Sequence, residues 1–230
     1  MDKLAEHVGL YDIWTVFFPG IVGILETLCF MGAMRGVCST SGFKEIKVFV
    51  PQTLSEWIVV IIFSVFFGLV FQEIGRKMRK VFKLKNAAKD IFKPGTELFE
   101  EKEITPIKRA LIQKGWNDQM TFNWINAQAQ DKRIAPRYVK LSVIQNMSLS
   151  LASTMLIGAV EGVVLFVHSI IKGAGGMMIV SGIAIVICIF LLIMFIKRSE
   201  RFNRYWVKSL VYAVATSNTG GKPESVKLEP

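Results

Sequence analysis

The chain has 230 residues, of which 52% are hydrophobic, and it carries a formal net charge of +10. Its mean hydropathy of +0.42 is too high for an ordinary soluble domain. In a soluble protein, so large a positive charge would suggest nucleic-acid binding. Here, however, the basic residues are gathered beside long apolar runs. Composition therefore predicts an integral membrane protein and argues against direct nucleic-acid binding.

Four segments are long enough to span a bilayer, which needs about 20 predominantly apolar residues. They lie at about residues 13–34, 54–74, 148–171 and 176–196. The first segment is expected to remain in the protein, because the opening residues are not strongly basic and no small-x-small cleavage site follows the apolar run. We therefore expect an all-α integral membrane protein with four transmembrane helices and a helical, basic cytoplasmic region between the second and third spans.

The distribution of positive charge predicts the orientation. Of 28 Lys and Arg residues, 16 lie between the second and third spans and 7 follow the fourth. Lys and Arg accumulate in the cytoplasmic loops of membrane proteins. Residues 75–147, the C-terminal tail and the N-terminus are therefore expected to be cytoplasmic.

Four regions follow from this layout. Residues 1–74 hold a short lead-in and the first two spans, and residues 75–147 form the cytoplasmic helical region. Residues 148–196 hold the third and fourth spans, and residues 197–230 a juxtamembrane helix with a polar, disordered tail. The second span is expected to continue as one helix to Pro94-Gly95, and another helical stretch is expected at about 106–130.

A basic segment directly after the second span is the predicted binding surface. It suits anionic lipid headgroups, at about 1 kcal/mol for each basic residue near the surface. It equally suits a cytoplasmic protein partner, whereas we expect no direct nucleic-acid contact. Its basic residues are Arg76, Lys77, Arg79, Lys80, Lys83 and Lys85.

Two acidic residues inside apolar spans are the main functional candidates. Glu26 and Glu161 occupy spans that run in the same direction, and each lies at a similar depth. Acidic groups at membrane depth are costly and commonly functional. An ion- or proton-related role, structural packing through hydrogen bonds, and a misplaced span boundary are the three interpretations. A helix pair within one chain or a ring in an oligomer would bring the two acids together.

Small residues at every fourth position of the third span predict close helix packing, and with it a homo-oligomer. They are Ser150, Thr154, Gly158 and Gly162. His168 lies on nearly the same helical face as Glu161 and is either a polar intramembrane residue or an interfacial one. Pro19-Gly20, within the first two turns of the first span, is either a hinge or a tolerated membrane proline.

No enzyme motif is visible, and we expect neither a catalytic residue nor a cofactor nor a metal. The chain has two histidines and no C-x-x-C pair. We expect Cys188 to be a core or lipid-facing residue. Cys29 and Cys38 fall near the outer face, where a disulfide between them is one alternative.

Two short stretches carry a family resemblance. YDIWTVFFPG, with Tyr11, Asp12, Pro19 and Gly20, and RSERFNRYWVKSLVYAV after the last span resemble small four-span bacterial inner-membrane proteins found beside anti-phage defence systems. The layout is similar to that of the membrane subunit of the Kiwa system. The resemblance implies a membrane-embedded oligomer that senses infection and recruits a cytoplasmic effector, and it transfers no catalytic residue. The alternative is an ion-conducting channel or pore-forming effector that uses Glu26 and Glu161.

Overall fold

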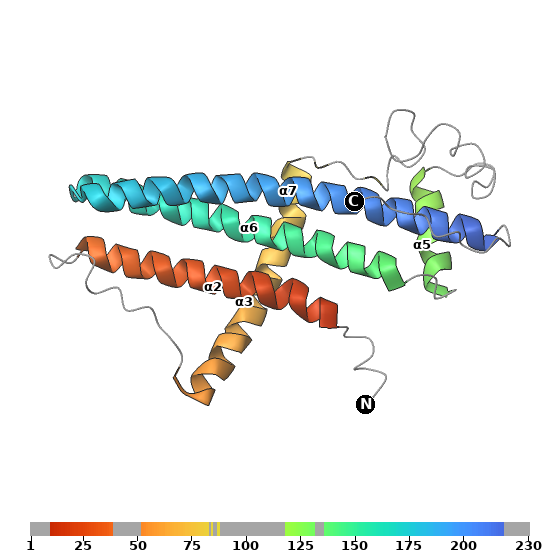
Figure 1. The fold of residues 1–230 in the computed structure, drawn as a ribbon, viewed down its shortest axis with the longest axis horizontal. Coiled ribbons are helices and arrows are strands. Elements are labelled where there is room, and N and C mark those ends of the chain that lie inside the picture. Colours follow the sequence, from red (N-terminus) through yellow and green to blue (C-terminus); the bar gives the residue numbers. More distant parts are fainter. Residues whose placement is uncertain are drawn as a thin grey trace. The chain divides into compact units, whose positions relative to one another are not determined.

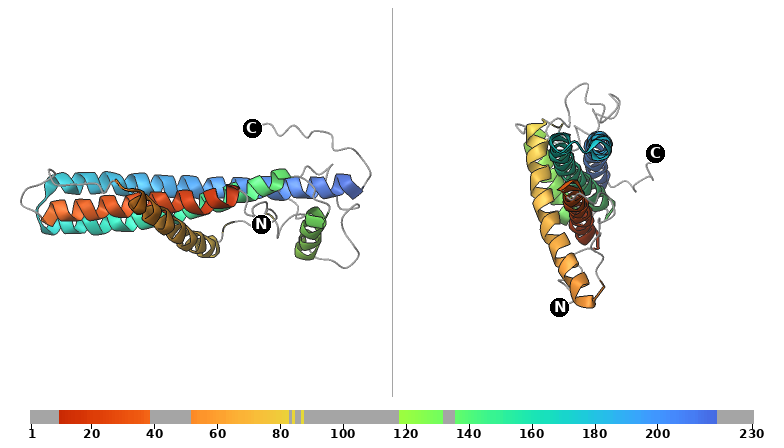
Figure 2. Two further views of the ribbon diagram at one scale, coloured as in Figure 1. Left: turned by 90° about the horizontal axis from the view of Figure 1, so that it is seen from below. Right: turned by 90° about the vertical axis from the view of Figure 1, so that its left-hand side faces the viewer.

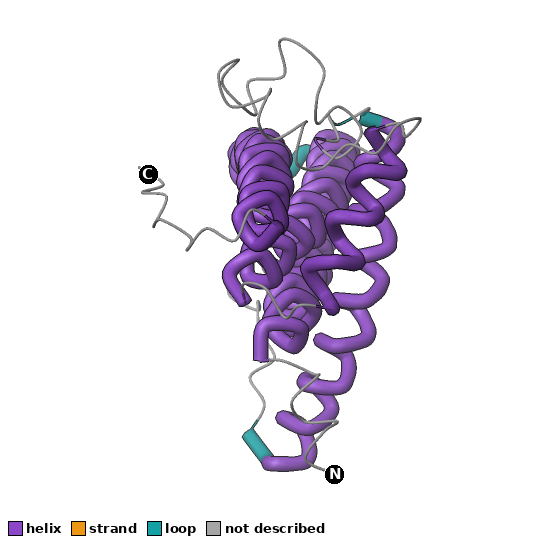
Figure 3. Tube along the Cα trace, turned by 90° about the vertical axis from the view of Figure 1, so that its right-hand side faces the viewer, coloured by secondary structure: helices purple, strands orange, loops and turns teal. Residues whose placement is uncertain are grey.

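The computed structural model describes residues 10–38, 52–82, 84, 87, 118–131 and 136–218. Within this part of the chain every regular element is a helix (Figures 1 and 3). The helices are α2 (Leu10–Cys38), α3 (Leu54–Val81), α5 (Asp118–Asp131), α6 (Pro136–Ile171) and α7 (Gly175–Asn218). The all-α prediction is confirmed for these residues.

Within the residues that the structure describes, four helices are long and apolar enough to cross a membrane, as the sequence predicted. Their candidate spans are Thr15–Arg35, Leu54–Val81, Lys140–Ile171 and Gly175–Ala215. The third and fourth predicted spans cover only part of α6 and α7, which have 36 and 44 residues. Helix propagation costs little once a helix is nucleated, so a helix continues where the apolar run ends.

The chain divides into two compact units. The first unit comprises Met1–Lys83 and Asn146–Ser199, and the second comprises Leu84–Gln145 and Glu200–Pro230. Helices α6 and α7 therefore supply residues to both units. Each unit is described by itself below.

Helix α3 begins at a capping box and ends earlier than predicted. The backbone N–H of Glu56 donates to Thr53 Oγ1 at 3.4 Å, while Glu56 Oε2 accepts from the backbone N–H of Thr53 at 3.2 Å. At the other end, the N–H of Phe82 donates to the carbonyl of Met78 at 2.8 Å. The prediction of one helix running to Pro94-Gly95 is therefore wrong, because α3 ends at Val81.

In the first unit, α2 and α3 cross (Figures 1 and 2), and Gly20 and Gly68 lie where the two helices meet. A Cβ at Gly20 would collide with the backbone carbonyl of Ser64, and one at Gly68 would collide with the backbone carbonyl of Val16. Both positions must therefore lack a side chain. Pro19 is buried inside α2, which is helical on both sides of it. The close approach of the two backbones explains why residue 20 is a glycine, whether or not Pro19-Gly20 acts as a hinge.

The second and third long helices also meet through small residues of the first unit. The hydroxyl of Ser153 donates to the backbone carbonyl of Phe71 at 2.8 Å and to that of Leu149 at 2.8 Å. A Cβ added at Gly75 of α3 would lie 2.9 Å from the Leu149 carbonyl oxygen. These contacts hold α3 against α6.

A short turn joins α6 to α7. Gly173 has φ 67°, a left-handed conformation that glycine adopts without strain. The N–H of Ala174 donates to the carbonyl of Ser169 at 2.9 Å, which closes the end of α6. Within the first unit, α7 therefore returns beside α6, and Ile185 of α7 lies against Gly162 of α6 (Figure 2).

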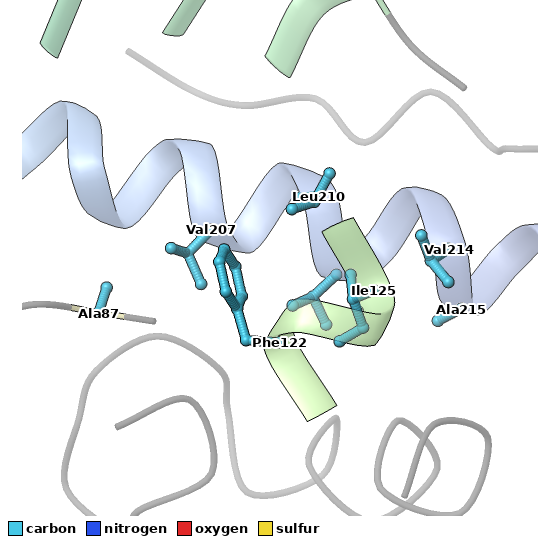
Figure 4. Close-up of a cluster of buried hydrophobic side chains, with 8 residues drawn as sticks. Ala87, Phe122, Ile125, Val207, Leu210, Val214 and Ala215 are labelled. Carbon is cyan, nitrogen blue, oxygen red and sulfur yellow. The ribbon is translucent and has the colours of Figure 1, made fainter. Parts of the chain in front are cut away.

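The second unit has an apolar core built from α5 and α7 (Figure 4). Phe122 and Ile125 of α5 face Val207 and Leu210 of α7. The complete cluster is Ala87, Phe122, Ile125, Val207, Leu210, Val211, Val214 and Ala215. The predicted helical stretch at 106–130 corresponds in part to α5, while 106–117 lie outside the described residues.

Candidate intramembrane carboxylate site

Glu26 and Glu161 line one cavity in the first unit. α2 carries Glu26 near the middle of its span, α6 carries Glu161, and α7 supplies a further wall of this partly open cavity. The cavity has a volume of about 340 Å³. Its lining residues are Glu26, Cys29, Phe30, Ala33, Gly158, Glu161, Gly162, Leu165, Met177, Val180, Ser181, Ala184 and Cys188. The two acids therefore come together within a single chain.

Glu161 is held by a hydrogen bond from the neighbouring helix. Thr27 Oγ1 of α2 donates to Glu161 Oε1 at 3.2 Å. Thr27 follows Glu26 directly, so one turn of α2 contributes both an acid to the cavity and a donor to the second acid. A hydrogen bond between membrane helices contributes about 0.6–2 kcal/mol.

Glu26 is positioned by the absence of a side chain at Gly158. A Cβ built on Gly158 would lie 3.1 Å from Cδ, Oε1 and Oε2 of Glu26. The glycine therefore lets the carboxylate lie directly on the α6 backbone. Glu26 Oε2 is buried, and no described residue donates a hydrogen bond to it.

The electrostatic environment of the cavity is negative. Both carboxylates line the same cavity. No Lys, Arg or His occurs among the residues that line this cavity. Two uncompensated carboxylates in an apolar setting are costly, so the site is suited to take up a proton or a cation.

The small-residue stripe of α6 is used inside the chain. The buried hydroxyls of Ser150 and Thr154 donate to the backbone carbonyls of Asn146 and Ser150, at 3.1 and 3.0 Å. Gly158 contacts Glu26, and a Cβ on Gly162 would lie 2.8 Å from Cγ1 of Ile185 on α7. In the described residues, the two glycines thus serve contacts of α6 with α2 and α7.

The remaining predicted site residues lie elsewhere. His168 is half-buried on α6 and is not among the residues that line the cavity. Arg76 forms an exposed ion pair with Glu73 at 3.1 Å. Lys77 and Lys80 are exposed and Arg79 is half-buried, all three on the last turns of α3. Lys83 and Lys85 lie outside the described residues.

Three residues at this site were missed by the sequence reasoning: Ser181 and Cys188 line the cavity, and Thr27 donates a hydrogen bond to Glu161. Thr27, Ser181 and Cys188 are polar or polarisable residues in apolar spans, but nothing in their spacing marks them. Cys188 lines the cavity together with both acids. A signal was available only for Thr27, because it adjoins Glu26.

A disulfide between Cys29 and Cys38 does not fit the structure. Both belong to the continuous helix α2, and Cys29 is a free thiol. At a rise of 1.5 Å per residue, their Cα atoms are about 13 Å apart. A disulfide requires Cα atoms within about 7 Å.

Among the described residues, no group of three His, Cys, Asp or Glu lies close enough to hold a metal ion.

Comparison with known proteins adds no relative: no family model, no curated protein and no solved structure matches the chain.

Proposed function

We propose that the chain is a non-enzymatic sensor or scaffold of the bacterial inner membrane that recruits a cytoplasmic effector in anti-phage defence. In this proposal both termini and residues 75–147 are cytoplasmic. The supporting observation is that α6 carries Glu161 of the intramembrane cavity and, in the same uninterrupted helix, Gln145 of the second unit. A continuous helix transmits a displacement along its axis.

At its second-unit end, α6 joins a buried polar network. Asn203 Nδ2 of α7 donates to Gln145 Oε1 at 3.2 Å, and Asn203 Oδ1 accepts from the backbone N–H of Ala87 at 3.0 Å. Ala87 belongs to the segment that follows the basic end of α3. We propose that a movement of α6 changes the bond between Gln145 and Asn203 and, through Asn203, the position of Ala87.

The proposed partners are anionic lipid headgroups, a cytoplasmic protein and further copies of the chain. Exposed apolar residues on α3, such as Trp57, Ile62 and Phe66, suit either lipid or a neighbouring subunit. Because Gly158 and Gly162 are engaged within the chain, we place the subunit seam on α3 rather than on the α6 stripe. The mass of the purified protein in detergent, measured by light scattering, tests the oligomer.

Charge reversal tests partner recruitment. The variant with Arg76, Lys77, Arg79 and Lys80 changed to Glu should lose recovery of the protein encoded by the neighbouring gene in a pull-down. A matched control reverses Arg35 and Lys172, which are expected on the outer side. Since Lys and Arg also set orientation, a C-terminal topology reporter must show that each variant keeps its orientation. Undiminished recovery by the correctly oriented fourfold variant would contradict the proposal.

A second function, ion conduction, is favoured by one observation, the two carboxylates in one cavity. If the protein is a channel or a pore-forming effector, purified protein in liposomes should release entrapped cations. Glu26→Gln and Glu161→Gln should then reduce the flux, because Gln keeps the size and hydrogen bonding of Glu without its charge. If the liposomes retain the entrapped cations, ion conduction is excluded and the sensor function remains.

A further inference from the structure

The cavity between α2, α6 and α7 has apolar walls. Its apolar lining includes Leu165 of α6, Met177, Val180 and Ala184 of α7, and Phe30 and Ala33 of α2. Its volume of about 340 Å³ is at the lower end of the range for pockets that hold small organic molecules. Apolar walls of this kind favour an organic body over a hydrated ion.

Its acidic groups come from two helices. Glu161 receives a hydrogen bond from Thr27, whereas the buried Oε2 of Glu26 receives none from the described residues. With no basic residue in the lining, a positive charge in the cavity would meet two carboxylates and no repulsion. The favoured occupant is therefore cationic.

We propose that this cavity binds a small lipophilic monocation, with its charge beside Glu26 and Glu161 and its apolar body against Leu165, Met177 and Val180. This binding site does not depend on the proposed sensor function. It also accounts for the glycine at position 158, because Gly158 leaves room for the Glu26 carboxylate at the cavity wall.

Other cations fit the cavity less well. Hard metal ions take six or more oxygen ligands, and beyond the two acids the lining side chains offer only the hydroxyl of Ser181. An aminophospholipid carries a phosphate next to its ammonium, and the phosphate would be repelled by the two carboxylates. Its headgroup also lies at the membrane surface, whereas Glu26 is near the middle of the span.

Binding of radiolabelled tetraphenylphosphonium to the purified full chain in lipid nanodiscs tests the proposal. After subtraction of empty nanodiscs, binding should be saturable. Triphenylphosphine oxide, which has a similar apolar body and no net charge, should not compete for the site. Glu26→Gln and Glu161→Gln should each weaken affinity by about tenfold or more, because each removes one of the two negative charges beside the bound cation. Glu26→Asp, which keeps the charge, should bind better than Glu26→Gln.

Glu73→Gln is the matched control, because Glu73 is an exposed acid of α3 outside the cavity and should leave the affinity unchanged. As a second readout, bound tetraphenylphosphonium should slow alkylation of Cys188 by a membrane-permeant maleimide, since Cys188 lines the same cavity. Variants are compared only when they elute from size exclusion as the parent does. Absence of saturable binding, equal affinity of all three Gln variants, or competition by triphenylphosphine oxide would overturn the proposal.

Discussion

Gly158 of α6 lies directly against the carboxylate of Glu26 of α2: a Cβ added at Gly158 would be 3.1 Å from both carboxylate oxygens. Three residues further along α6, Glu161 accepts the hydrogen bond of Thr27. The α2–α6 contact is thus built from two adjacent positions on α2 and two positions one helical turn apart on α6. Both acids of the cavity are consequently positioned by the same pair of helices.

The two glycines at the α2–α3 crossing should be intolerant of any side chain. We expect Gly20→Ala and Gly68→Ala each to lower the free energy of unfolding by about 1–3 kcal/mol or more, because the new Cβ meets backbone atoms that cannot move aside. The measurement is unfolding in mixed detergent micelles. Gly176→Ala is the control, since a Cβ there meets nothing within 4 Å. Equal stability of all three variants would show that the helices do not approach as described.

Removal of the hydroxyl of Thr27 should weaken the contact between α2 and α6. Thr27→Val keeps the shape of the side chain and removes the donor to Glu161. We expect a loss of about 0.6–2 kcal/mol of unfolding free energy. Thr154→Val is the matched control, because its hydroxyl bonds only to the Ser150 carbonyl of its own helix in the contacts described above. A larger effect for Thr154→Val than for Thr27→Val would argue against the interhelical bond.

The polar network of the second unit should depend on Asn203. In Asn203→Leu the buried N–H of Ala87 and the amide of Gln145 both lose their partner. An unsatisfied buried group costs about 1–3 kcal/mol, so we expect a lower unfolding temperature. Hydrogen exchange of the peptide that contains Ala87 should also become faster.

Arg201→Leu provides the comparison for this position, because Arg201 is exposed on the same helix. It should leave both the unfolding temperature and the exchange near Ala87 unchanged. If Asn203→Leu behaves like Arg201→Leu, the network does not hold the segment at residue 87.

The predicted orientation is open to a direct test. Reporter fusions after Arg35, Asp118 and Gly221 should report the outer, inner and inner sides of the membrane, because the basic residues lie mainly in residues 75–147 and after the fourth span. Paired enzymes that are active on only one side provide the measurement. Outer-side activity at Asp118 would reverse the topology and with it the proposed place of partner binding.

The local sequence was sufficient to predict the four long helices. Apolar length is a property of each segment alone, and it is set by the thickness of a bilayer rather than by neighbouring helices. Glu26 and Glu161 could be singled out for the same reason, because a charge inside an apolar run is visible without a fold. The end of α3 was predicted wrongly, since no Pro or Gly precedes Pro94 after Gly75 to mark a stop at Val81.

The tertiary structure alone decided which faces meet. The stripe from Ser150 to Gly162 predicted close packing, but only the fold shows that Gly158 and Gly162 serve α2 and α7 of the same chain. Ser181 and Cys188 became cavity residues, and Thr27 the donor to Glu161, only when α2, α6 and α7 packed together. In each case the reason is physical: hydropathy specifies that a helix enters a membrane, whereas its rotation about its own axis is set by side-chain contacts with its neighbours.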